Sequence, residues 1–210
     1  MPEQALQSPG NGAWRTYAYW SFWVSIAFFT VYPSCNWLTG RRSATLDLYI
    51  PAELNVPFIP EFVWLYLSLY VLFSIPPFTL DPVRMRTLGI QLVTATIFCG
   101  VIFILLPAKL GFERIVPNDP FYGKLFTNLF SVDLPHNMVP SLHVVFSALI
   151  LLAASDGPRP KLIKAIFMGW LVLICISTVL VHQHHLLDVV TGLFVATMFR
   201  HLIGKRGSHA

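Results

Sequence analysis

Charged side chains are scarce in this sequence. Only 11% of its 210 residues are Asp, Glu, Lys or Arg, whereas 55% are hydrophobic, and soluble domains carry about 25% charged residues. This deficit excludes an ordinary soluble domain and predicts an integral membrane protein. The net charge of +4 does not indicate binding to nucleic acid, because the basic residues are scattered between apolar runs.

Cysteine is also rare. Cys35, Cys99 and Cys175 all lie inside apolar runs, where we expect them to pack as small hydrophobic side chains. Their spacing matches neither a metal-binding motif nor a disulfide framework. Cysteine therefore predicts no cofactor and indicates nothing about the cellular compartment.

Long apolar runs occupy most of the chain. A bilayer core needs about 20 apolar residues per helix, and six segments are candidates: Trp20–Leu38, Phe62–Leu80, Leu88–Pro107, Val139–Ala154, Lys164–Val181 and His184–Ile203. The sequence therefore predicts an all-α, polytopic membrane protein with six transmembrane helices in one bundle. The fourth and sixth segments are the weakest candidates, because they are short or carry polar residues at one end.

The chain is predicted to form one domain. Residues 1–19 are polar and rich in Pro and Gly, and we expect a disordered or interfacial lead-in that lacks the features of a cleaved signal peptide. Residues 20–203 form the predicted six-helix membrane domain, and residues 204–210 form a tail.

Lys and Arg are distributed unevenly between the two predicted sides. The N-terminus, the second and fourth loops and the C-terminus hold nine of them, and the other loops hold five. Because cytoplasmic loops carry an excess of Lys and Arg, we expect both termini in the cytoplasm. The expected location is the plasma (inner) membrane.

Polar groups gather on the predicted non-cytoplasmic side. His143 begins the fourth segment, His184 and Asp188 begin the sixth, and Lys109 and Arg114 lie in the third loop. Ionisable residues at membrane depth mark a functional site by default. His184 and Asp188 are four residues apart and share a helical face, so the carboxylate can fix the imidazole tautomer and leave one nitrogen free.

Ser141 precedes His143 and is a predicted helix N-cap. Backbone N–H groups at such a helix start favour an anion. Two histidines, an orienting carboxylate and nearby cations suit phosphoryl transfer, in which one histidine attacks phosphorus and the other protonates the leaving oxygen.

Other interpretations stay open at this point. The group His182, His184, His185 and Asp188 could hold zinc, although nearby cations would repel a metal. Lys109 could be an interfacial anchor, and Asp188 could act only at the helix N-terminus. His185 is three residues from Asp188 and is the rival of His184 as the reactive histidine.

The motifs resemble those of the type-2 phosphatidic acid phosphatase superfamily, which includes vanadium haloperoxidases. "PSLH", Pro140 to His143, is similar to the Pro-Ser-Gly-His signature with Leu142 in place of Gly, and His184 and Asp188 match the His-x-x-x-Asp signature. Thr178 stands where the third signature has Arg. The first signature is matched loosely, since "KLGFERIVP" offers Lys109 and Arg114 without an Arg-Pro pair.

The resemblance implies roles for these residues. His184 would form a phosphohistidine, Asp188 would orient it, and His143 would act as the general acid. Lys109, Arg114 and Ser141 would bind phosphate, and such enzymes use no metal or other cofactor.

The implied activity is a lipid-phosphate phosphatase that acts on membrane lipids at the non-cytoplasmic face, with an unknown oligomeric state. The motif pattern without that Arg also resembles the branch that contains inositol phosphorylceramide synthases and sphingomyelin synthases. This resemblance implies an alternative activity, the transfer of a phospho head group to an alcohol. A non-catalytic lipid-phosphate transporter or binding protein is the alternative from another class.

Overall fold

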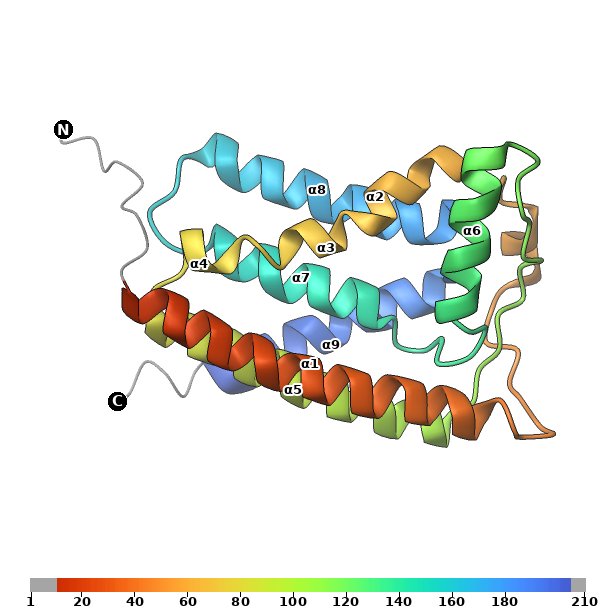
Figure 1. The fold of residues 1–210 in the computed structure, drawn as a ribbon, viewed down its shortest axis with the longest axis horizontal. Helices are drawn as coiled ribbons and strands as arrows, with labels where there is room; N and C mark the ends of the chain where they lie inside the picture. Colours follow the sequence, from red (N-terminus) through yellow and green to blue (C-terminus); the bar gives the residue numbers. More distant parts are fainter. Residues whose placement is uncertain (1–10, 205–210) are drawn as a thin grey trace.

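The structure is a computed structural model that describes residues 11–204. Within this range every regular element is a helix, apart from one isolated parallel bridge between Leu46 and Ala108. The predicted all-α class is confirmed. Most helices run along one long axis, as Figure 1 shows.

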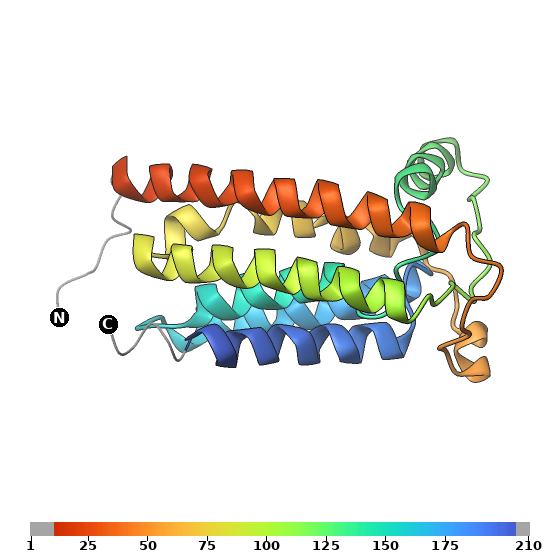
Figure 2. The same cartoon turned by 90° about the horizontal axis from the view of Figure 1, so that it is seen from below.

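Helices α1 (Asn11–Thr39) and α5 (Pro82–Leu105) lie side by side along this axis (Figures 1 and 2). Asp81 begins α5 as an N-cap, because its carboxylate accepts the N–H groups of Val83 and Arg84 at 2.9 Å. Gly89 allows the close approach, since a Cβ there would lie 2.4 Å from the ring of Trp20.

Helix α7 (Leu142–Ser155) lies in the middle of the bundle. It packs against α5, α8 (Lys161–Leu180) and α9 (Leu186–Gly204). Val145, Leu149 and Leu151 on α7 are fully buried. Apart from His143, Ser147 and Ser155, every residue of this helix is apolar, as expected for a helix that is buried among others.

The segment predicted as a single helix over Phe62–Leu80 is broken. It forms a 3-10 turn (Pro60–Phe62) and the short helices α2 (Val63–Leu67), α3 (Leu69–Leu72) and α4 (Pro76–Thr79). At the first break, Ser68 donates its hydroxyl to the carbonyl of Leu65 at 2.6 Å and accepts the indole N–H of Trp170 at 2.8 Å. Pro76 and Pro77 are the first two residues of α4, and they lack the N–H groups that would continue the preceding helix into it.

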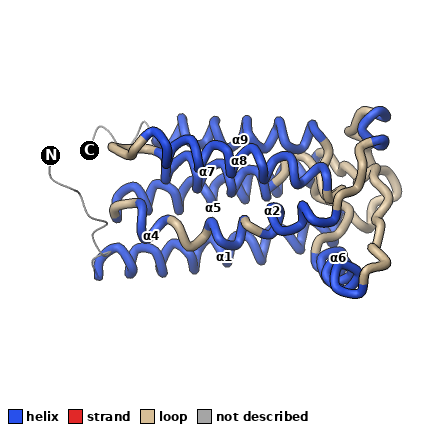
Figure 3. The backbone as a smooth tube through the Cα atoms, turned by 90° about the horizontal axis from the view of Figure 1, so that it is seen from above, coloured by secondary structure: helices blue, strands red, loops and turns tan. Residues whose placement is uncertain are grey.

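Helix α6 (Pro120–Val132) lies across one end of the bundle, beside the loops that Figure 3 shows in tan. The sequence analysis missed this helix inside the third loop. Its signal is local: Tyr122, Leu125, Phe126, Leu129 and Phe130 follow helical spacing and pack in one cluster with α2. The 3-10 helix Pro51–Asn55 lies in the loop after α1.

Three of the described helices are long and apolar enough to cross a membrane: α5, α8 and α9. They correspond to the third, fifth and sixth predicted segments. The count of six spans is not confirmed, because the second segment is broken, α7 is only 14 residues long, and α1 is rich in Trp and Tyr. Helix α1 begins at Asn11, so residues 11–19 of the predicted disordered or interfacial lead-in are helical. The rest of the predicted lead-in, residues 1–10, and residues 205–210 of the predicted tail lie outside the described residues.

Candidate active site

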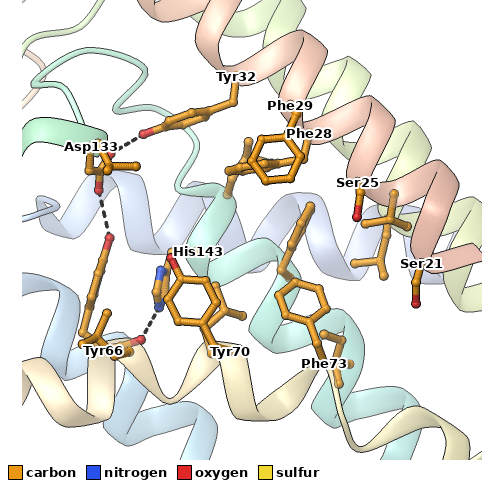
Figure 4. Close-up of a pocket in the computed structure, with 18 of the residues that line it drawn as sticks. Ser21, Ser25, Phe28, Phe29, Tyr32, Tyr66, Tyr70, Phe73, Asp133 and His143 are labelled. Atoms are coloured by element: carbon orange, nitrogen blue, oxygen red, sulfur yellow. Dashed lines mark hydrogen bonds between the residues drawn. The ribbon is translucent and has the colours of Figure 1, made fainter. Parts of the chain in front are cut away.

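A cavity of about 760 Å³ runs between α1, the broken segment α2–α4, α5, α6 and α7. Tyr17 and Tyr32, both on α1, line it; their separation corresponds to about 22 Å of helix, so the cavity is long. Most of its wall is apolar or aromatic (Figure 4). One end contains His143, His184 and Asp133, and we call it the head end.

His184 and Asp188 form the predicted pair at the start of α9. The Nδ1 atom of His184 lies 3.2 Å from Oδ2 of Asp188. Because a carboxylate accepts, Nδ1 carries the hydrogen and Nε2 keeps a lone pair. Asp188 is only 1% exposed, and the same oxygen also accepts the backbone N–H of His185 at 2.8 Å. The pair is therefore held rigidly with one nitrogen of His184 uncommitted to the described residues.

His185 has a different environment. Its Nε2 accepts the backbone N–H of Gly111 at 3.0 Å, and its Nδ1 lies 3.2 Å from the carboxylate of Glu53. Its ring is stacked between Tyr49 and Phe112, with centroid distances of 4.6 and 4.3 Å. Burial lowers the pKa of His185, against the opposing effect of Asp188 and Glu53. Both ring nitrogens are occupied, so this arrangement favours His184 as the reactive histidine.

Glu53 was missed by the sequence analysis. Its side chain is buried, and its Oε2 accepts the backbone N–H of Leu186, the first residue of α9, at 2.8 Å, in addition to contacting His185. Glu53 thus joins the loop after α1 to the start of α9. No local pattern reveals this contact, because the partners are more than 130 residues apart in sequence.

His143 is oriented by Tyr66. Its Nε2 lies 2.8 Å from the carbonyl oxygen of Tyr66, and the two rings stack at 4.0 Å. A carbonyl only accepts, so Nε2 carries the hydrogen and Nδ1 is the nitrogen left for chemistry. The carbonyl of Tyr66 is available because the helix is interrupted beside it, at Ser68.

The predicted N-cap at Ser141 is confirmed. Its hydroxyl accepts the N–H of Val144 at 3.3 Å, and its own N–H donates to the carbonyl of Asp188 at 3.1 Å. Gly192 permits this contact between α7 and α9, because a Cβ there would lie 2.9 Å from the carbonyl of Ser141. The Ser141 side chain is fully buried and does not line the cavity, and its hydroxyl is directed to the backbone of α7.

Asp133, at the end of α6, contributes a carboxylate to the head end. Its two oxygens accept the hydroxyl groups of Tyr32 from α1 and Tyr66 from α2, the latter at 2.9 Å (Figure 4). The sequence analysis did not single out any of these three residues.

The predicted cations do not line the cavity. Lys109 pairs with Asp47 at 3.3 Å, and both side chains are about half exposed. Arg114 donates to the carbonyls of Phe130, at 3.0 Å, and of Asp133. Lys109 and Arg114 are thus directed to other protein groups, the latter to free carbonyls at the end of α6.

Thr178 stands where the resembling signature has Arg. It is buried, and its hydroxyl donates to the carbonyl of Cys175 at 2.8 Å. Its own carbonyl accepts the N–H groups of Gln183 and His184, each at 3.0 Å. This position therefore shapes the turn that presents His184.

The alternative zinc site is not assembled. The Nε2 of His182 bonds to the carbonyl of Val56 at 2.9 Å, and His185 faces Glu53 and Gly111. Among residues 11–204, no three His, Cys, Asp or Glu side chains are arranged to hold a metal ion.

The model of the PAP2 superfamily matches residues 86–205, which is more than half of the chain. The chain therefore belongs to the PAP2 superfamily, whose members are phosphatases or related enzymes that act on phosphate esters. A curated relative, the uncharacterized protein MJ0662 of Methanocaldococcus jannaschii, is 31% identical over 106 residues. This match covers 49% of the chain but only 41% of the relative.

Proposed function

We propose that this protein cleaves lipid phosphate esters through a phosphohistidine at His184. The observation that carries the proposal is the pair of histidines at the head end of a long apolar cavity. An apolar chain of the lipid would occupy the cavity, which burial of hydrocarbon favours. The phosphate would then lie beside His184 and His143.

The proposed reaction has two steps. The lone pair on Nε2 of His184 attacks phosphorus, and the bond from phosphorus to the leaving oxygen breaks. His143, protonated on both ring nitrogens at this stage, gives that oxygen the proton on Nδ1 and keeps the Nε2–H on the carbonyl of Tyr66. Asp188 stabilises the positive charge that develops on His184. Water then attacks phosphorus and passes its proton to His143, and the P–N bond breaks with return of its electron pair to Nε2.

The same intermediate could react with an alcohol instead of water, which gives lipid phosphotransfer as the second candidate. Thr178 stands in place of a phosphate-binding Arg, and this replacement favours phosphotransfer. The hydrolysis of phosphomonoesters, which carry more negative charge, benefits from the positive charge of that Arg. A non-catalytic phosphate binder is disfavoured, since such a site would need cations more than two imidazoles.

We further propose that the site faces away from the cytoplasm, in the plasma membrane. The excess of Lys and Arg at the opposite end of the bundle supports this orientation. In Figure 2 the beginning of α1 and the end of α9 lie at one end of the bundle, and the loops near the histidines lie at the other.

Labelling with a ³²P-lipid phosphate tests the covalent step. His184→Ala should abolish turnover and labelling, whereas His201→Ala, an exposed position on the same helix, should leave both unchanged. His143→Ala should lose about 10²–10⁴-fold on natural lipids and less on an activated aryl phosphate, whose leaving group needs no proton. Labelling that persists in His184→Ala would contradict the proposal.

Asp188→Asn tests the orienting role. An amide cannot stabilise the imidazolium, so we expect a loss of at least about 100-fold in kcat with the protein still folded. The melting temperature in detergent, measured beside kcat, separates this result from unfolding. Wild-type kcat in a folded Asp188→Asn protein would exclude the role.

A further inference from the structure

The head end of the cavity contains a carboxylate, and none of the described residues that line it is Lys or Arg. Asp133 is the only acidic residue among these described lining residues. A site for a doubly charged phosphate normally presents Arg, Lys or a cluster of N–H groups. The charged residues of this lining therefore favour a substrate whose phosphate carries less negative charge.

Asp133 is fixed in this position. Each of its carboxylate oxygens accepts a tyrosine hydroxyl, one from α1 and one from α2, so the side chain is held from two sides. Arg114 is the nearby cation, but its guanidinium donates to backbone carbonyls at the end of α6 and does not line the cavity.

Two further carboxylates lie behind the histidines. Asp188 and Glu53 are 1% and 4% exposed, and their side-chain partners are the imidazoles of His184 and His185. Lys109 is directed to Asp47 instead. A phosphate beside His184 is thus close to three carboxylates, whereas the side chains of Lys109 and Arg114 are directed to other groups.

From this arrangement we infer that the site takes a lipid phosphodiester in preference to a lipid phosphomonoester. A diester phosphate carries one negative charge, whereas a monoester carries about 1.5 to 2 at pH 7. Near a protein surface, one additional like-charge interaction over several ångströms is worth on the order of tenfold in binding. The inference rests on the proposed function and specifies its substrate class.

A phosphodiester reacts in the same two steps. His184 displaces one alkoxide, which takes a proton from His143, and the remaining ester stays on the phosphorus bound to Nε2. Attack by water, with its proton passing to His143, would release a phosphomonoester. Attack by an alcohol would release a new phosphodiester.

A matched pair of lipids tests the inference with the full chain in mixed micelles. Dioleoyl phosphatidic acid and its methyl ester, dioleoyl phosphatidylmethanol, share the same acyl chains and release the same diacylglycerol. We expect kcat/KM for diacylglycerol release to be about tenfold higher for the diester at pH 7.5. The ratio should narrow at pH 5.5, because the second pKa of a phosphomonoester is about 6.

Added charge provides the second measurement. Asn128 is exposed on α6 and lines the cavity, so Asn128→Arg should raise activity on phosphatidic acid relative to the diester. Thr127→Arg adds the same charge at an exposed neighbour that does not line the cavity and should leave the ratio unchanged. Asp133→Asn should act in the same direction as Asn128→Arg, with Asp119→Asn as its control at the other end of α6.

The outcomes separate the two proposals. Activity that requires His184 but favours the monoester, with no response to Asn128→Arg, would overturn the preference for diesters alone. Cleavage of neither lipid, or cleavage that survives His184→Ala, would overturn the proposed function and this inference with it.

Discussion

Tyr66 makes three contacts that bear on His143. Its carbonyl accepts Nε2–H, its ring stacks on the imidazole, and its hydroxyl donates to Asp133. The first contact sets the tautomer, and the second fixes the plane of the ring. A general acid has to be oriented within hydrogen-bond reach of the leaving oxygen, so Tyr66 is a positioning residue in the proposed reaction.

Substitutions at Tyr66 should therefore affect the acid step selectively. Tyr66→Phe keeps the ring and the carbonyl, and we expect a small loss. Tyr66→Leu removes the stacking partner and should lower kcat on natural lipids by about 10- to 100-fold, part of the usual contribution of general acid catalysis. An activated aryl phosphate should show a much smaller loss.

Tyr32→Phe is the matched control, since Tyr32 also donates to Asp133 but no ring stacking between it and His143 is found in the described structure. Tyr32→Phe should show the same small loss of kcat as Tyr66→Phe. Equal losses of Tyr66→Leu on both substrates would indicate a purely structural role.

At the scale of elements, the start of α9 depends on the loop after α1. Glu53 accepts the first N–H of α9 and contacts His185, which is stacked between Tyr49 and Phe112. This arrangement places His184 at the head end, with Asp188 buried behind it. The loop is thus part of the framework of the site.

Glu53→Gln should destabilise the protein by about 1–3 kcal/mol, the cost of leaving buried donors without a matching acceptor. Chemical denaturation in detergent measures this change in the free energy of unfolding. Glu61→Gln, at an exposed position, should change it little. An unchanged free energy in Glu53→Gln would exclude the proposed anchoring of α9.

The buried histidines of these loops should make the fold sensitive to acid. Burial lowers the pKa of His182 and His185 below the ordinary value of about 6.5. The unfolded chain then binds protons first as pH falls, so stability decreases below about pH 6.5 until the folded-state pKa is reached. The melting temperature should therefore fall between pH 7 and pH 5.

His201→Gln serves as the control, because His201 is exposed and its replacement should leave the pH dependence unchanged. A melting temperature that stays constant or rises between pH 7 and pH 5 would contradict the expected contribution of these histidines.

On the scale of the whole molecule, α6, which carries Asp133 at its end, lies at one end of the bundle, and the start of α1 and the end of α9 lie at the other (Figures 1 and 2). Asn118 is exposed near α6, and Pro158 is exposed between α7 and α8 at the other end. These positions therefore report on the orientation of the bundle in the membrane.

Single cysteines test this orientation. In intact cells, Asn118→Cys should react with an impermeant thiol reagent, and Pro158→Cys should react only after the membrane is permeabilised. The test uses a Cys175→Ala background, since Cys35 and Cys99 are buried. The reverse labelling pattern would place the active site on the cytoplasmic face.

Features that depend on near neighbours in the chain were determined by the sequence alone. Composition predicts a helical membrane protein, and the spacing of His184 and Asp188 predicts their hydrogen bond, which is present at 3.2 Å. The N-cap at Ser141 is equally local. Such features can be predicted because helical periodicity and capping act over three or four residues.

Only the tertiary structure decided which distant groups meet. His143 finds the carbonyl of Tyr66 across 77 positions, and His185 finds Glu53 across 132. The same packing directs Arg114 to the end of α6 and places Asp133 at the head end. A buried polar group needs a hydrogen-bond partner. Which partner it finds depends on how the helices and loops pack against one another, and this packing is not visible in the local sequence.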